Sequence, residues 1–180
     1  MAKSDRKTIE KVFILLGSAV TVVLIGAGGL AWYGYHFATT NVRNELSAQK
    51  IYFPAKGDPA LDPIKFPDLQ QYAGQQVNDG PKAKAYANGF IGRHLAVIAD
   101  GKTYAEISAE AMKNPTNQKL QAQKQALFQG ETLRGILLGD GYAYWTFGMI
   151  AKYAAFASFA GAVIMGSLVL LGVRHLTSLK

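Results

Sequence analysis

Two long apolar stretches without a charged residue lie near the two ends of the chain, at residues 12–35 and 153–173. A helix rises about 1.5 Å per residue, so about 20 apolar residues cross the roughly 30 Å hydrocarbon core of a bilayer. Both stretches reach this length and predict transmembrane helices. We expect the second helix to enter the membrane near Phe147, because Lys152 in its first turns extends its ammonium group to the lipid headgroups.

Between these stretches, apolar residues recur every three or four positions, which is typical of amphipathic helices. Asp79, Gly80 and Pro81 predict the start of one helix, which is expected to end at Asp100 and Gly101. No segment shows the alternation of apolar and polar residues that a half-buried strand requires. The central part of the chain therefore reads as helical.

Local signals set the other boundaries in this part of the chain. Thr103 and Glu106 form a capping box and predict a helix start. A further helix is expected at residues 117–138, ended by the glycines of residues 139–141. The first transmembrane helix is expected to continue until Pro54, which begins an irregular, proline-rich connector.

The sequence thus predicts an all-α membrane protein in which two transmembrane helices flank a small helical extracytoplasmic domain. The expected parts are a basic N-terminus (1–11), the first transmembrane helix (12–35), the helical domain (36–146), the second transmembrane helix (147–173) and a short C-terminus (174–180).

Much of the formal net charge of +7 lies on the outer flanks of the two spans. The flanking cations are Lys3, Arg6, Lys7, Lys11, Arg174 and Lys180. Positive flanks stay in the cytoplasm, so we expect both termini there, the protein in the plasma membrane and the central domain outside. Basic and acidic residues between the spans nearly balance and are scattered, and no nucleic-acid-binding face is predicted.

Aromatic residues gather where the chain is expected to leave the membrane. Such residues are typical of an interfacial belt. The predicted belt, with the snorkelling lysine, consists of Trp32, Tyr33, Tyr35, Tyr142, Tyr144, Trp145 and Lys152. A cleaved signal peptide ending near Ala31 is the alternative for the first stretch. The long apolar run and the aromatic residues after it favour a retained helix.

The second span carries small residues at a spacing of four. Ala154, Ser158, Ala162 and Gly166 form this stripe, with Ala157 and Gly161 beside it. Small residues allow close approach of helix backbones, which drives association in lipid. We predict that this stripe is a helix-packing interface with the first span, a second copy or another membrane protein. Val163 and Val169 are expected to lie on the opposite, lipid-facing side.

The residues most often used in catalysis and metal binding form no recognisable constellation. The absence of cysteine excludes disulfides, thiol catalysis and thiolate metal sites. His36, His94 and His175 are far apart in the sequence and lack a metal-binding spacing. Glu131 and Arg134 are spaced for an ion pair on one helix face. No catalytic, metal or cofactor site is predicted.

Four segments of the chain, together with the two spans, resemble a family of uncharacterised two-pass membrane proteins of actinobacteria. The segments are residues 49–54 (QKIYFP), 100–106 (DGKTYAE), 128–135 (FQGETLRG) and 144–148 (YWTFG). The resemblance implies the same architecture and a location in the cell envelope. Some members carry an aromatic-ring-opening dioxygenase label, but the scattered histidines do not supply the iron ligands that such an enzyme needs.

These observations favour a non-enzymatic accessory or scaffolding subunit of a larger plasma-membrane assembly, with respiratory complexes as one candidate class. The expected partners are the lipid bilayer and other membrane subunits, or a second copy, packed on the second span. The alternative is an extracytoplasmic binding module for a lipid, a quinone or another apolar envelope molecule, because aromatic residues are dense near the outer interface.

Overall fold

A computed structural model describes residues 3–178 as an all-α protein, which confirms the predicted class. This range holds no strand, and one isolated β-bridge joins Tyr52 to Gln76. The α-helices are α1 (Lys3–Ala48), α2 (Gly80–Lys84), α3 (Gly92–Ile98), α4 (Tyr104–Lys113), α5 (Gln118–Ile136) and α6 (Tyr144–Ser178). Two short 3-10 helices, η1 (Pro59–Leu61) and η2 (Pro67–Tyr72), and two π-helical segments, η3 (Ala85–Ile91) and η4 (Leu137–Ala143), complete the elements.

The chain forms two compact units. One comprises the described residues up to Phe37 and from Phe147 onward, and the other comprises residues 38–146. Two continuous helical stretches, Arg6–Ala48 and Gln118–Ser178, are long and apolar enough to cross a membrane. Only 11% of the residues in the most apolar window of the first, and 6% in that of the second, are buried within the protein. They therefore differ from the core helices of a soluble protein, which are mostly buried.

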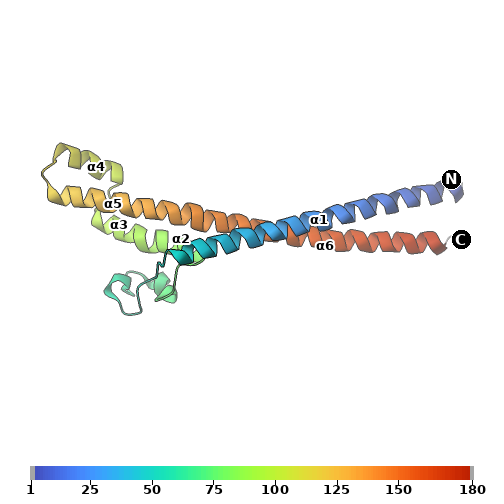
Figure 1. Ribbon diagram of the computed structural model, residues 1–180, viewed down its shortest axis with the longest axis horizontal. Helices are drawn as coiled ribbons and strands as arrows, with labels where there is room; N and C mark the ends of the chain where they lie inside the picture. The colour runs from blue at the N-terminus through green and yellow to red at the C-terminus, as the bar shows by residue number, and fades with distance from the viewer. Residues whose placement is uncertain (1–2, 179–180) are drawn as a thin grey trace. The chain divides into compact units, whose positions relative to one another are not determined.

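In the first unit, α1 and α6 run side by side in opposite directions (Figure 1). The antiparallel pairing places Ile14 of α1 beside Gly172 of α6 at one level and Gly28 beside Phe159 at another. At the end of the pair where the chain termini lie, the Glu10 carboxylate is 3.4 Å from Arg6 Nε and 3.5 Å from His175 Nε2. The unit is a helix hairpin.

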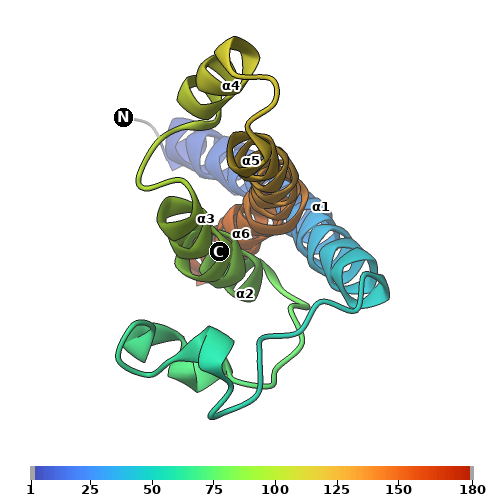
Figure 2. The same cartoon turned by 90° about the vertical axis from the view of Figure 1, so that its left-hand side faces the viewer.

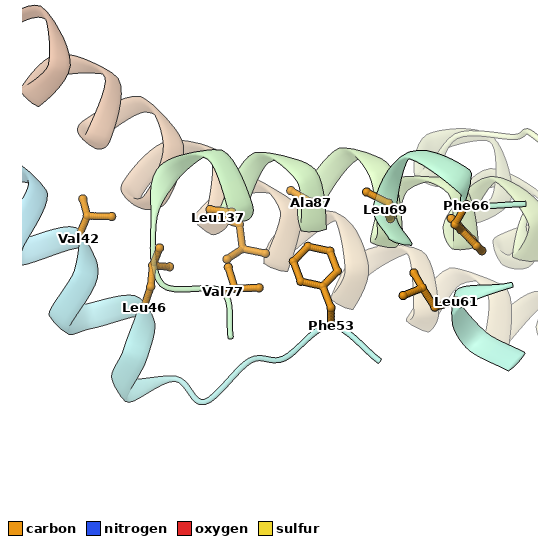
Figure 3. Packing of buried hydrophobic residues seen from close by; sticks show 10 residues of the cluster. Val42, Leu46, Phe53, Leu61, Phe66, Leu69, Val77, Ala87 and Leu137 are labelled. Atoms are coloured by element: carbon orange, nitrogen blue, oxygen red, sulfur yellow. The ribbon is translucent and has the colours of Figure 1, made fainter. Parts of the chain in front are cut away.

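The second unit is built on an apolar cluster that draws on widely separated segments (Figure 3). Its largest fully buried members include Phe53, Leu61, Leu137 and Val77. Phe53 lies in the proline-rich connector, where its ring stacks on Tyr72 at 5.2 Å and meets Tyr86 edge-on at 5.0 Å between centroids. The connector is thus part of the core although it has little regular structure.

A second, smaller cluster joins α3, α4 and α5, which Figure 2 shows grouped together. It consists of Leu95, Ala99, Ile107 and Leu127. The start of α4 has the predicted capping box, in which Thr103 Oγ1 accepts the Glu106 amide and Glu106 Oε2 accepts the Thr103 amide. A reciprocal cap of this kind satisfies two amides that would otherwise lack partners at the helix start.

Two predicted boundaries were wrong, the helix end at residues 139–141 and the extension of the first helix to Pro54. The glycines at 139–141 do not end the helix, because α5, η4 and α6 are continuous. Both glycines lie within the π-helical segment η4. A Cβ at Gly141 would lie 3.0 Å from the Ala83 Cβ, so this glycine permits close packing of α2. The first helix, α1, ends at Ala48, with Lys50 in a left-handed conformation, instead of reaching Pro54. The helix predicted between Asp79 and Asp100 is confirmed, and its middle is the π-helical segment η3.

Candidate functional site

The contact between α1 and α6 in the first unit follows a spacing of three and four residues on both helices. In α1, positions 10, 14, 17, 21, 24, 28 and 31 are buried or half-buried, and in α6 the same holds for positions 148, 151, 155, 158, 162, 165, 169, 172 and 176. We call these positions the seam. Alternation of three and four is the pattern of left-handed helix pairs, in which side chains of one helix fill gaps in the other.

Glycines in the seam bring the two helices close together. A Cβ at Gly28 would lie 2.7 Å from Phe159 Cε1, and a Cβ at Gly17 would lie 2.7 Å from Val169 Cγ2. Thr21 donates its hydroxyl to the Gly17 carbonyl at 2.8 Å, so its methyl group is free to face Gly166. The seam is therefore packed by van der Waals contact and presents no unpaired hydroxyl at this level.

The predicted small-residue stripe falls only partly on the seam. Ala162 is buried, and Ser158, Gly161 and Gly166 are half-buried, whereas Ala154 and Ala157 are exposed. The predicted stripe has a period of four residues, whereas the pairing of α1 with α6 follows a mean period of 3.5 residues. The stripe and the seam therefore diverge along the helix. Packing of Ala154 and Ala157 against another protein stays a prediction.

The two valines predicted to face lipid, Val163 and Val169, have different surroundings in the structure. Val163 is 70% exposed. Val169 is half-buried and contacts the Gly17 position, so its assignment to the lipid-facing side was wrong. The reason is again the spacing. Position 169 lies seven residues, which is one heptad, beyond the buried Ala162 and therefore on the same side of α6.

The opposite side of α1 carries a second series with the same spacing, which sequence reasoning missed. We call this series the outward face: Leu15, Ala19, Val22, Gly26, Gly29 and Tyr33, all exposed. Apart from the adjacent residues and the nearby backbone of α1 itself, no atom of the described residues lies within 4 Å of a Cβ built on Gly26 or Gly29. The two glycines thus leave a shallow, smooth region on an otherwise bulky apolar helix. The pattern of fours and threes was visible in the sequence.

The predicted belt residues of the first unit lie close together. The Lys152 ammonium is 5.3 Å from the centroid of the Tyr35 ring, and the Trp32 ring is 5.4 Å from that of Tyr35. Trp32 also meets Phe156 of α6 at 5.8 Å, and Tyr33 stacks on Phe37. These contacts hold one end of the hairpin together by ring packing.

The belt residues of the second unit have different surroundings. Trp145 is half-buried and packs on the main apolar cluster, where a Cβ at Gly80 would meet its side chain. Lys84 donates to the Tyr142 hydroxyl at 3.2 Å, and this hydrogen bond lowers the pKa of Tyr142. Tyr144 lines a groove described below. A role of these residues at a membrane interface stays a prediction.

A groove with a cavity volume of about 330 Å³ opens in the second unit between the end of α1 and the η4 region. We call it the acidic groove, and it is lined by Asn41, Val42, Glu45, Leu46, Gln49, Ile136, Asp140 and Tyr144. Its charged residues are two carboxylates, Glu45 and Asp140. Sequence reasoning missed it, because its walls lie about ninety positions apart in the chain.

Most other charged side chains of the second unit are engaged with partners. Arg93 donates to both oxygens of Asp68 at 2.7 and 2.8 Å, which lowers the pKa of that carboxyl group. Glu131 pairs with Arg134, as the spacing predicted. His94 lies 2.9 Å from the Phe90 carbonyl and stacks on Phe66, so it is a structural residue of the core. Within residues 3–178, no three His, Asp or Glu residues are grouped to hold a metal ion.

Comparisons of the chain with protein-family models, with curated proteins and with solved structures found no match. The resemblance to the actinobacterial two-pass proteins therefore stays a prediction.

Proposed function

We propose that this protein is a non-enzymatic accessory or scaffolding subunit of a larger plasma-membrane assembly. In this proposal the hairpin spans the membrane, both termini are cytoplasmic and the second unit lies outside. Two apolar helices with mostly exposed surfaces support the membrane location, because lipid is the environment in which such surfaces are stable. The antiparallel pairing of α1 and α6 supports the placement of both termini on one side.

The outward face of α1 carries the proposal. An exposed glycine in a helix costs roughly 1 kcal/mol relative to alanine, and in lipid it gains nothing unless another helix packs on it. Gly17 and Gly28 are used by the hairpin itself, but Gly26 and Gly29 are left open. The heptad-like spacing of the outward face matches what a third helix would need in order to pack there. We assign this face to a helix of a neighbouring subunit.

Replacing Gly26 or Gly29 with leucine should separate the protein from this neighbour. The bulky side chain would hold the partner backbone away, while lipid would accept it without cost. The matched control is Ala27→Leu, which adds the same side chain at the same depth on an exposed position off the outward face. We expect insertion into the membrane to be unchanged in all three variants.

Native mass spectrometry after extraction in several mild detergents is the direct test. The 19.4 kDa wild-type chain should be recovered in a complex with at least one other protein, and the two glycine variants should be recovered mainly alone. Migration of the wild-type chain as a bare monomer in every detergent would contradict the proposal. Bound lipid or quinone on such a monomer would favour the alternative binding module instead.

A further inference from the structure

Charged side chains join α1 to α6 at the end of the hairpin where the chain termini lie. Glu10 Oε1 of α1 is 3.4 Å from Arg6 Nε, one turn away on the same helix, and 3.5 Å from His175 Nε2 of α6. The contact with Arg6 stays within α1, whereas the contact with His175 crosses from one helix to the other. Glu10 thus links the two helices through an imidazole.

The Glu10 carboxylate is partly withdrawn from water. Its side chain is 21% exposed, and its second oxygen, Oε2, is buried without a hydrogen-bond partner among the described residues. A carboxylate oxygen removed from water without a partner costs free energy, and a nearby positive charge reduces that cost. The stability of this end of the hairpin therefore depends on the positive charge around Glu10.

The charged groups at this level of the two helices respond differently to pH. Arginine and lysine side chains keep their charge between pH 5 and 8, whereas histidine changes its charge within this range. The His175 side chain is 52% exposed, so it exchanges protons with the solvent. The other described cations near Glu10 are Arg6, Lys7, Lys11 and Arg174. The positive charge that reaches Glu10 from α6 at His175 is thus the one that pH controls.

We propose that Glu10 and His175 form a pH-sensitive clasp, which holds this end of the hairpin closed when His175 is protonated. The imidazolium attracts the carboxylate across the two helices, so the pairing of the helix ends is most stable at low pH. As the pH rises and His175 loses its proton, this stabilisation is lost. Arg6 cannot replace it, because Arg6 and Glu10 lie on the same helix. The clasp joins two residues of this chain, so the inference does not depend on the proposed partner.

Distances between nitroxide labels, measured by double electron–electron resonance on the full chain in lipid nanodiscs, test the clasp. The labels are placed on Val12→Cys and Val173→Cys, two exposed positions near the clasp in a chain without native cysteine. Between about pH 5.5 and about pH 8, we expect the population with separated helix ends to rise roughly two- to fivefold, which is the effect of a partly exposed ion pair. Labels on Val23→Cys and Val163→Cys, exposed positions further along the same helices, should report the same distance at both pH values.

Two variants and a matched control assign the pH response to the clasp. His175→Gln keeps a polar side chain that cannot be protonated, and it should hold the helix ends in the distribution that the unchanged chain shows at high pH. Glu10→Gln removes the negative charge and should abolish the pH dependence. His36→Gln removes the other histidine of the hairpin, which lies beside Trp32, and should leave the response intact. Distances that do not change with pH in the unchanged chain, or a pH response that survives in His175→Gln, would overturn the proposal.

Discussion

Replacing Phe53 with alanine should lower the free energy of unfolding of the second unit by about 3–5 kcal/mol. The Phe53 side chain is 2% exposed and contacts the rings of Tyr72 and Tyr86. Its removal would leave a cavity between the connector and the helices, and both aromatic contacts would be lost. Pulse proteolysis of the full chain in detergent, over a series of urea concentrations, measures this change in the second unit.

The control for this prediction is the preceding residue. Tyr52 is 53% exposed, so Tyr52→Ala removes a similar ring without opening a cavity. We expect its effect to stay below about 1 kcal/mol. Equal effects of the two substitutions would show that the connector does not belong to the core of the unit.

A leucine at Gly28 should force α1 and α6 apart. A Cβ at this position would already lie 2.7 Å from the Phe159 ring, and the remaining atoms of leucine have no space in the seam. The separated helix surfaces would contact lipid instead of each other. This exchange gives no gain in hydrophobic free energy that could offset the lost packing. Oxidative cross-linking reports the separation. The chain has no cysteine, so the pair Thr21→Cys and Gly166→Cys forms a clean probe across the seam.

We expect the disulfide between these two cysteines to form readily in the otherwise unchanged chain and to fall several-fold with Gly28→Leu. The adjacent Gly29→Leu is the matched control, because no described residue outside its own stretch of α1 lies within 4 Å of its Cβ position. It should leave the disulfide intact and, on our proposal, still release the partner. If Gly28→Leu leaves the cross-link unchanged, the seam is misplaced.

Features that depend on neighbouring residues were predictable from the sequence. The capping box at Thr103 and Glu106 is confirmed, because both groups that form it lie within one helical turn. The two long apolar helices and the all-α class follow from runs and spacings that need no tertiary information. The Glu131–Arg134 ion pair belongs to the same category, since the two residues lie on one turn of α5.

Features that depend on distant residues were not predictable in the same way. The glycines of η4 read as a helix end, but Gly141 is needed where Ala83 approaches, more than fifty positions away in the sequence. Phe53 stands in a proline-rich segment without periodicity, so its burial follows only from the folded connector. The acidic groove depends on the approach of residues 41–49 to residues 136–144. Local sequence patterns contain no information on which distant segments of the chain come into contact.

The small-residue stripe on α6 is an intermediate case. Its composition indicated close helix packing, and Ala162 and Gly166 do lie against α1. The predicted stripe has a spacing of four, whereas the pairing of α1 and α6 alternates three and four, so the prediction that Val169 faces lipid was wrong. The same alternation at positions 15–33 of α1 would have identified the outward face from sequence alone.

Labelling of single cysteines on intact cells tests the membrane hairpin, on which the whole account depends. Cysteines are introduced at Gln125 in the second unit, and at Arg6 and Ser178 near the two chain ends, all exposed positions. The chain has no native cysteine to interfere. A membrane-impermeant maleimide should label Gln125→Cys in intact spheroplasts, and should label Arg6→Cys and Ser178→Cys only after the membrane is opened. Labelling of either terminal cysteine from outside, or protection of Gln125→Cys, would contradict the account.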